Sequence, residues 1–389
     1  MTTNADFLRQ VLSKLRTFRV EAGLSEGDVE NRLILGSGWV SSIESGEIVP
    51  TLDVIASLLS VYNKTLTDLV AGAAGAVPKI YRSIFAVPNG TGIDINFSYS
   101  RHDAVYHLPN ATVDQFNTII STLRDGLSLL TVTDNNSEAI KADSVSNTFL
   151  KAVEIWPGAN PSDLWWFLVS RAYYDPYNHP AKYCRLDFSQ SWKRTGGWSL
   201  EKILVKHYAP FLATHGINLF IADATRRQTL IAPLAQIGHL EADKLDVMLT
   251  VGTGANEKVI GVVHVKASFA ERRSDDVPMS EILVRAGYIS PLWTMDCKST
   301  PSTRPLNRGE LGDVFSGTGA DSRSAKREDI ETRRYFSACF SYNSRTLPTP
   351  ATFQQALAKI QVCDFRNPDD AFSQFIINER ARIRIELGI

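Results

Sequence analysis

The sequence predicts an α/β core preceded by a small all-α domain. Residues 5–70 contain only helix-like segments, in which apolar residues recur every three or four positions between glycine or proline breaks. Residues 199–287 contain a helix-like segment, then three apolar strand-like runs, then a second helix-like segment. This order is typical of a mixed sheet flanked by helices.

The composition narrows the class of protein. The chain has 389 residues, enough for two or three domains, and its 44% hydrophobic and 21% charged content is that of an ordinary globular protein. The net charge of −1 argues against a nonspecific polycation, although a specific DNA-binding enzyme needs only a local basic surface. No apolar run is long enough to span a bilayer, and no signal peptide is evident. The four scattered cysteines favour reduced thiols and a cytoplasmic location.

The N-terminal domain is predicted to consist of five short helices. Gly23 ends the first helix, Ser25 caps the second, and Gly36 lies in the turn before the third. The expected segments are residues 5–22, 25–33, 38–45, 52–62 and 66–69. A glycine-bearing turn between the second and third of several short helices is the helix-turn-helix pattern.

This domain resembles the lambda-repressor-like (XRE) helix-turn-helix domains. The resemblance covers residues 8–70 and rests on Gly23, Leu24 and Ser25, on residues 39–46, and on Pro50. It implies that the third helix enters the major groove of DNA, with Ser37, Trp39, Ser41 and Ser42 as the contact candidates. The third helix has no Arg, Lys, Gln or Asn to read base edges, so a domain used only for dimerisation is the alternative.

Changes in composition indicate where the domains meet. Residues 71–78 are small, apolar and without periodicity, as expected of a linker. We therefore expect four parts: a helix-turn-helix domain at 1–72, a linker at 73–79, a helical and mixed region at 80–195, and the α/β core at 196–389.

The most informative stretch is residues 259–287. An apolar strand-like run there ends in Lys266, and a lysine at the end of a buried strand is costly unless an anionic group meets it. Asp246 lies in a neighbouring strand-like run. Carboxylates that bind Mg²⁺, together with a lysine that offsets phosphate charge, are the minimal set for hydrolysing a phosphodiester. The stretch therefore predicts a metal-dependent nuclease site.

The acid that usually lies two residues before such a lysine is absent, because His264 occupies that position. Glu281 lies fifteen positions after Lys266, on a helix whose start is marked by Asp276 and whose end is marked by Gly287. A helix packed back on the strand would bring Glu281 to the place of the missing acid. His264 itself is either a general base or metal neighbour, or a packed and hydrogen-bonded side chain.

This displaced acid resembles the CCGG family of PD-(D/E)xK restriction endonucleases, and within it the BsaWI-type enzymes. The resemblance covers residues 190–300 and is most specific between Lys266 and Glu281. It departs from the family in a short spacing between Asp246 and Lys266, and in Leu245 where proline usually precedes the aspartate. The implied fold is a restriction-endonuclease-like mixed sheet flanked by helices.

The resemblance also implies roles for individual residues. Asp246, Lys266 and Glu281 would be catalytic, with Asp246 and Glu281 binding Mg²⁺, and Glu201 would be an outer carboxylate near a second metal or a water. The charged turn would read bases, because arginine matches guanine and a carboxylate accepts from cytosine. A solvated charged turn is the alternative. The implied base-reading residues are Arg272, Arg273, Asp275 and Asp276.

A second D-x-K pattern, Asp296 to Lys298, is a rival catalytic site. A loop follows it, without a helix that carries a carboxylate. We therefore expect Lys298 and Arg304 to contact DNA phosphates instead.

The expected function is that of a type II restriction endonuclease, using Mg²⁺ to cut double-stranded DNA at a palindromic CCGG-containing site. It would act as a homodimer or larger homo-oligomer beside a cognate DNA methyltransferase. One alternative is an XRE-family transcriptional regulator with a large non-catalytic C-terminal domain. Another is a nuclease of the same fold that acts in repair or on modified DNA.

Overall fold

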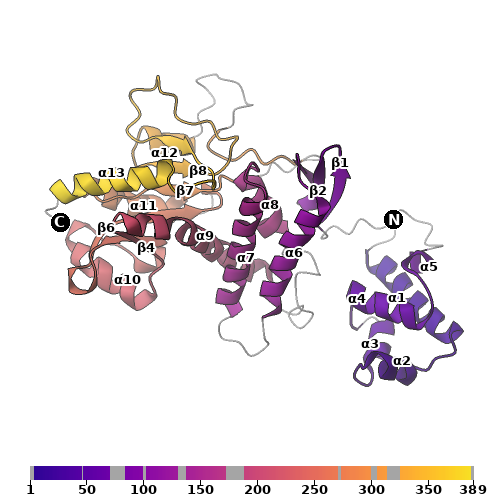
Figure 1. The fold of residues 1–389 in the computed structure, drawn as a ribbon. Coiled ribbons are helices and arrows are strands. Elements are labelled where there is room, and N and C mark those ends of the chain that lie inside the picture. Colours follow the sequence, from indigo (N-terminus) through magenta and orange to yellow (C-terminus); the bar gives the residue numbers. More distant parts are fainter. Residues whose placement is uncertain are drawn as a thin grey trace. The chain divides into compact units, whose positions relative to one another are not determined.

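The computed structural model describes residues 4–45, 47–70, 84–99, 102–129, 137–171, 188–269, 273–298, 305–312 and 325–386. The chain divides into two compact units, residues 1–81 and residues 82–389 (Figure 1). The expected linker at 73–79 lies outside the described residues. Among the described helices, none combines the length and the apolar character needed to cross a membrane.

The first unit is all-α, as predicted. Its helices are α1 (Asn4–Glu21), α2 (Glu26–Leu33), α3 (Trp39–Glu44), α4 (Leu52–Val61) and α5 (Leu66–Val70). Ser25 caps α2 in a capping box with Asp28, which satisfies two backbone N–H groups at the start of the helix. The apolar faces of the helices enclose one core, whose fully buried members include Leu15, Val29 and Ile43.

Two buried glutamates fix α3 in this unit. The Glu30 carboxylate accepts a hydrogen bond of 3.0 Å from the backbone N–H of Val40 at the start of α3. At the other end, Glu44 forms an ion pair with Arg19 of α1, with Nε 2.6 Å from Oε1 and Nη2 2.7 Å from Oε2. The helix-turn-helix arrangement is therefore held by charged groups as well as by its apolar core.

The second unit begins with a three-stranded antiparallel sheet of β1 (Phe85–Asn89), β2 (Gly92–Tyr99) and β3 (His102–Leu108). Side chains alternate along these strands, so that Ile93, Ile95 and Phe97 are buried on one face. This face shares a core with α6 (Val113–Ser128), α7 (Ser137–Ile155) and α8 (Pro161–Arg171).

A six-stranded mixed sheet forms the centre of the second unit, in the order β4-β5-β6-β7-β8-β9. Adjacent strands from β4 to β6 are antiparallel, whereas those from β6 to β9 are parallel. The mixed sheet flanked by helices confirms the predicted fold class. The strands are β4 (Ile217–Phe220), β5 (Val247–Val251), β6 (Lys258–Lys266), β7 (Leu292–Thr294), β8 (Cys339–Ser341) and β9 (Ile360–Val362).

Helices cover both faces of this sheet. On one face, Val263 and Val265 of β6 share a core with α9 (Phe188–Thr214) and α13 (Ala371–Glu386). On the other face, Val262 packs with α10 (Ala224–Ile231) and α11 (Arg273–Arg285). Helix α12 (Ala325–Glu331) contributes Ile330 to a smaller core with Leu292 of β7.

Gly261 shows how closely β6 approaches the segment that leads into β7. A Cβ atom at this position would lie 2.1 Å from the carbonyl oxygen of Ile289. Only glycine therefore allows the parallel bridge between Gly261 and Ile289, which brings the end of α11 back to the sheet.

Candidate active site

The structure brings Asp246 and Lys266 together, as the sequence predicted. Asp246 lies directly before β5, next to the carboxyl end of β6. Its Oδ2 accepts hydrogen bonds of 2.8 Å from the backbone N–H of Val265 and of 2.8 Å from Nζ of Lys266. The carboxylate is thus positioned by the backbone of β6 and not only by the lysine.

Asp276 supplies a second carboxylate to the same lysine. It lies in the first turn of α11, and its Oδ1 is 3.3 Å from Nζ of Lys266. The side chains are shielded from solvent, with exposed fractions of 11% for Lys266 and 3% for Asp276. Burial alone would lower the pKa of Lys266, but Asp246 and Asp276 together raise it above the ordinary value. Lys266 is therefore a protonated ammonium group between two carboxylates.

His264 lies on the same face of β6 as Lys266, two residues earlier, because side chains alternate along a strand. Its ring is fully buried and packs edge-to-face on Phe336. Nε2 is 3.1 Å from Oγ of Ser290, and Nδ1 is 4.0 Å from Oδ1 of Asp276. Burial lowers the pKa of His264 to about 4, so the imidazole is neutral at physiological pH.

These side chains fit a divalent cation. Asp246, His264 and Asp276 each offer one donor atom, and the three atoms lie within 4.8 Å of one another. The ammonium of Lys266 already occupies a cationic position between the two carboxylates. Two carboxylate oxygens form a suitable start to the coordination sphere of a hard cation such as Mg²⁺, and water completes it.

Glu281 does not belong to this cluster. It lies five residues after Asp276 on α11, which turns its side chain by about 140° and moves it about 7.5 Å along the helix. Its Oε1 is 2.5 Å from Nη2 of Arg285, one helical turn further on. On α11, Asp276 contacts Lys266, whereas Glu281, which the sequence predicted as the displaced acid, pairs with Arg285.

Glu201 also lies outside the donor cluster. It belongs to α9, whose neighbouring Leu200 and Leu204 pack in the core on the opposite face of the sheet from α11. Glu201 is therefore not among the donor groups that the described residues bring together around Lys266.

The predicted base-reading turn is described only in part. Arg272 lies outside the described residues, while Arg273 and Asp275 belong to the start of α11 without a description of their side chains. Asp276, expected here as a base reader, faces Lys266 instead. The signal in the sequence was its position near the start of the helix that follows the strand ending in Lys266.

In the rival D-x-K pattern, Asp296 belongs to a buried hydrogen-bond network. Asp296 is fully buried, and its Oδ1 accepts a hydrogen bond of 2.6 Å from the backbone N–H of Glu310 while its Oδ2 accepts one of 2.7 Å from Thr346. Burial raises the pKa of Asp296 to about 6. Lys298 forms an ion pair of 2.8 Å with Glu310. Arg304 lies outside the described residues.

The candidate DNA contacts of the first unit are only partly accessible. Ser37 and Ser41 are exposed, whereas Trp39 and Ser42 are half-buried. Trp39 packs against the apolar core of the unit. Two serines thus remain as the exposed members of the predicted contact set.

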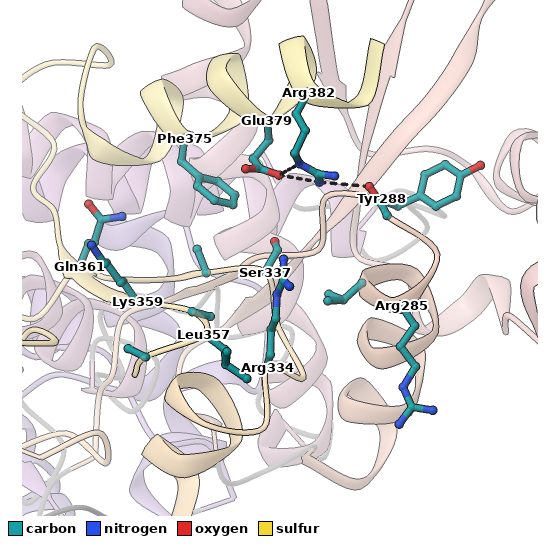
Figure 2. Close-up of a pocket in the computed structure, with 15 residues that line it drawn as sticks. Arg285, Tyr288, Arg334, Ser337, Leu357, Lys359, Gln361, Phe375, Glu379 and Arg382 are labelled. Atoms are coloured by element: carbon teal, nitrogen blue, oxygen red, sulfur yellow. Dashed lines mark hydrogen bonds and ion pairs between the residues drawn. The ribbon is translucent and has the colours of Figure 1, made fainter. Parts of the chain in front are cut away.

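A separate cavity of about 410 Å³ lies at the N-terminal ends of the parallel strands β7, β8 and β9. It is lined by Tyr288, Ser337 and Lys359, which precede β7, β8 and β9, whereas Lys266 lies at the carboxyl end of β6. Figure 2 shows Arg382 beside Glu379 in its wall, with Nη2 of Arg382 2.7 Å from Oε2 of Glu379. This cavity is therefore distinct from the cluster around Lys266.

Comparisons with known proteins match both units. Residues 12–71 match the helix-turn-helix domain family. The HTH-type transcriptional regulator DdrOP3 of Deinococcus deserti is 30% identical over 86 residues, which are 20% of this chain and 67% of that protein.

The larger match is to the type II restriction enzyme AgeI of Thalassovita gelatinovora. It is 36% identical over 255 residues, which cover 64% of this chain and 87% of AgeI. The crystal structure of an AgeI–DNA complex aligns with a TM-score of 0.61 and 33% identity, over 76% of this chain and 99% of that one. A BsaWI–DNA complex aligns over 70% of this chain and 94% of that one, at 14% identity and a TM-score of 0.34. The chain belongs to the type II restriction enzyme family that includes AgeI, and it carries an additional N-terminal helix-turn-helix domain.

Proposed function

We propose that this restriction endonuclease uses Mg²⁺ to hydrolyse double-stranded DNA at a palindromic site that contains CCGG. The observation that carries the catalytic part of the proposal is the ammonium group of Lys266 between Asp246 and Asp276 at the end of β6. The DNA in the AgeI crystal structure supports duplex DNA as the substrate.

Each residue of the cluster has a distinct task in this reaction. Bound Mg²⁺ would supply an activated water molecule and offset negative charge on the phosphate. Asp246 and Asp276 hold the cation, and the N–H of Val265 fixes the orientation of Asp246. Lys266 keeps its proton and donates to a phosphate oxygen, where it stabilises the charge that develops in the transition state. Glu281 is an alternative second carboxylate, but its pairing with Arg285 favours Asp276.

Recognition of the G·C pairs falls to the residues at the start of α11. Asp276 is engaged by Lys266, which leaves Arg272, Arg273 and Asp275 as the base-reading candidates. Arginine donates to O6 and N7 of guanine, and aspartate accepts from N4 of cytosine, so this set suits a core of G·C pairs.

A palindromic site requires two active sites related by a two-fold axis, so we infer a homodimer or larger homo-oligomer on DNA. The host DNA would carry the same sites, so a cognate methyltransferase is the expected cellular partner. Both the endonuclease and the methyltransferase act on DNA inside the cell, so we infer a cytoplasmic location.

The helix-turn-helix domain would bind a second DNA site or add contacts beside the first. Ser37 and Ser41 are the exposed candidates on and before α3. Replacing Ser41 with aspartate should weaken any binding through α3 by charge repulsion with phosphates and leave the catalytic cluster intact. Footprinting of the variant on a cleavable duplex would show whether protection extends beyond the cleavage site.

Two duplexes of equal composition test the proposal. One carries CCGG and the other carries GGCC in the same flanks, and each is incubated with and without Mg²⁺. We expect cleavage of the CCGG duplex alone, and only with the metal. Equal cleavage of both would favour a nuclease of this fold without this specificity. Tight, salt-sensitive binding without cleavage would favour a regulator.

A further inference from the structure

His264 occupies the position two residues before the lysine, where PD-(D/E)xK sites usually carry an acid, and its environment is that of a ligand more than of a packing residue. It is fully buried, and Nδ1 has no hydrogen-bond partner among the residues that the structure describes. A buried polar atom without a partner destabilises the protein, and an apolar residue such as the neighbouring Val262 would fill the same face of β6 without that cost. The histidine therefore calls for an explanation beyond packing.

A chain of hydroxyl groups orients the imidazole. Oγ of Ser280 donates to the carbonyl oxygen of Ser290 at 3.3 Å and lies 2.7 Å from Oγ of Ser290. With the proton of Ser280 on that carbonyl, the hydroxyl of Ser290 is able to donate to Ser280 and to accept from Nε2–H of His264. In this tautomer the proton is on Nε2 and the lone pair is on Nδ1.

The lone pair of Nδ1 is directed to the carboxylate cluster. Nδ1 is 4.0 Å from Oδ1 of Asp276, and the donor atoms of Asp246, His264 and Asp276 all lie within 4.8 Å of one another. Opposed ligands of a small divalent cation are about 4.2 Å apart, at about 2.1 Å from the ion. Adjacent ligands at that distance are about 3.0 Å apart and only one pair of the three can be opposed, so binding one cation requires the donors to close by about 1–2 Å.

We propose that Nδ1 of His264 binds the catalytic divalent metal directly, together with Asp246 and Asp276. This inference rests on the proposed metal site and adds a nitrogen ligand to it. Magnesium prefers oxygen ligands, whereas imidazole suits transition metals. The site consequently binds Mn²⁺ in preference to Mg²⁺ by a larger factor than a site built of carboxylates alone, and Ser280 and Ser290 position the ring by holding Nε2.

The direct test is electron spin-echo envelope modulation of the full-length protein with Mn²⁺ alone at substoichiometric concentration. We expect ¹⁴N modulation from one coordinated imidazole. The modulation should disappear in His264→Gln and persist in His215→Gln, which changes an exposed histidine after α9. Bound Mn²⁺ without ¹⁴N modulation in the unmodified protein would overturn the inference, and that measurement requires no variant to fold.

Metal affinities give the second readout. His264→Gln should weaken Mn²⁺ binding about tenfold or more while weakening Mg²⁺ binding less, and Ser290→Ala should have a smaller effect in the same direction. His264→Glu should restore an all-oxygen site and lower the ratio of Mn²⁺ to Mg²⁺ affinity. An unchanged ratio in both His264 variants would contradict the inference.

Variants of Asp246 and Asp276 distinguish a failure of this inference from a failure of the proposed function. If Asp246→Asn and Asp276→Asn abolish Mn²⁺ binding but His264→Gln has no effect, the metal site stands and His264 is not a ligand. If neither aspartate variant alters Mn²⁺ binding, the proposed metal site is wrong and the inference fails with it.

Discussion

Nζ of Lys266 lies 3.3 Å from Oδ1 of Asp276, across the junction between the end of β6 and the first turn of α11. The two groups are ten residues apart in the sequence, and Asp246, directly before β5, completes the cluster. Of the two carboxylates considered on α11, Asp276 is therefore the one that contacts Lys266, while Glu281 pairs with Arg285.

Lys266→Ala should reduce the rate of DNA cleavage at least about a hundredfold, because the transition state loses a fixed positive charge. Specific binding to the DNA site should survive. Single-turnover cleavage and filter binding measure the two effects separately. Lys298→Ala is the matched control, and a loss of cleavage in that variant with retention in Lys266→Ala would move the catalytic centre to the second D-x-K pattern.

Asp276→Ala should abolish cleavage, whereas Glu281→Ala should retain it within a few-fold. The physical reason is that, of these two carboxylates on α11, Asp276 contacts Lys266 while Glu281 pairs with Arg285. The same single-turnover assay compares the two variants at saturating Mg²⁺. The reverse result would restore Glu281 as the displaced acid and make Asp276 a positioning or base-reading residue.

Arg19→Met should destabilise the helix-turn-helix unit by about 3–5 kcal/mol, because it leaves the buried carboxylate of Glu44 without its partner. Arg16→Met is the control, since Arg16 is 69% exposed and 4.0 Å from Glu44, and should cost less than about 1 kcal/mol. Amide hydrogen exchange in α1 and α3 reports the local effect. Equal protection in both variants would show that the buried pair is not stabilising.

Asp296 should make folding stability depend on pH between about 4 and 6. Burial raises its pKa from 3.8 to about 6, so in this window the folded state binds a proton that the unfolded state has released. The stability from this group is present below about pH 4 and is lost as pH rises through about 6, by about 3 kcal/mol in total.

Denaturant unfolding at pH 4 and pH 7 gives the free energy of unfolding of each protein. The difference between the unmodified protein and its variant gives the contribution of Asp296. Asp296→Asn should remove the change, whereas Asp369→Asn, at an exposed position, should keep it. An identical pH profile for Asp296→Asn and the unmodified protein would show that Asp296 does not titrate in this window.

The sequence predicted the parts of the site that depend on local pattern. Lys266 stands at the end of an apolar run and Asp246 beside another, so their strands could be paired and the two groups brought together. The choice between Asp276 and Glu281 depended on where α11 begins. The sequence placed that start near Asp276, but the helix starts at Arg273, which sets Asp276 in its first turn.

The parallel strands β8 and β9 were not predicted. Each has three residues, and each pairs with a segment distant in sequence, so neither periodicity nor turn chemistry marks them. The structural role of Asp296 was also not predicted from the sequence, because it depends on a hydrogen bond from Thr346, fifty residues away. Long-range packing decides such features, and local pattern does not.

Digestion of phage DNA with and without Mg²⁺, followed by sequencing of the fragment ends, tests metal-dependent cleavage at CCGG most directly. We predict discrete fragments whose ends all fall within one palindromic CCGG-containing sequence, formed only with the metal. The same ends would reveal the flanking bases and the stagger. Intact DNA in Mg²⁺, or fragments ending at unrelated sequences, would contradict the account.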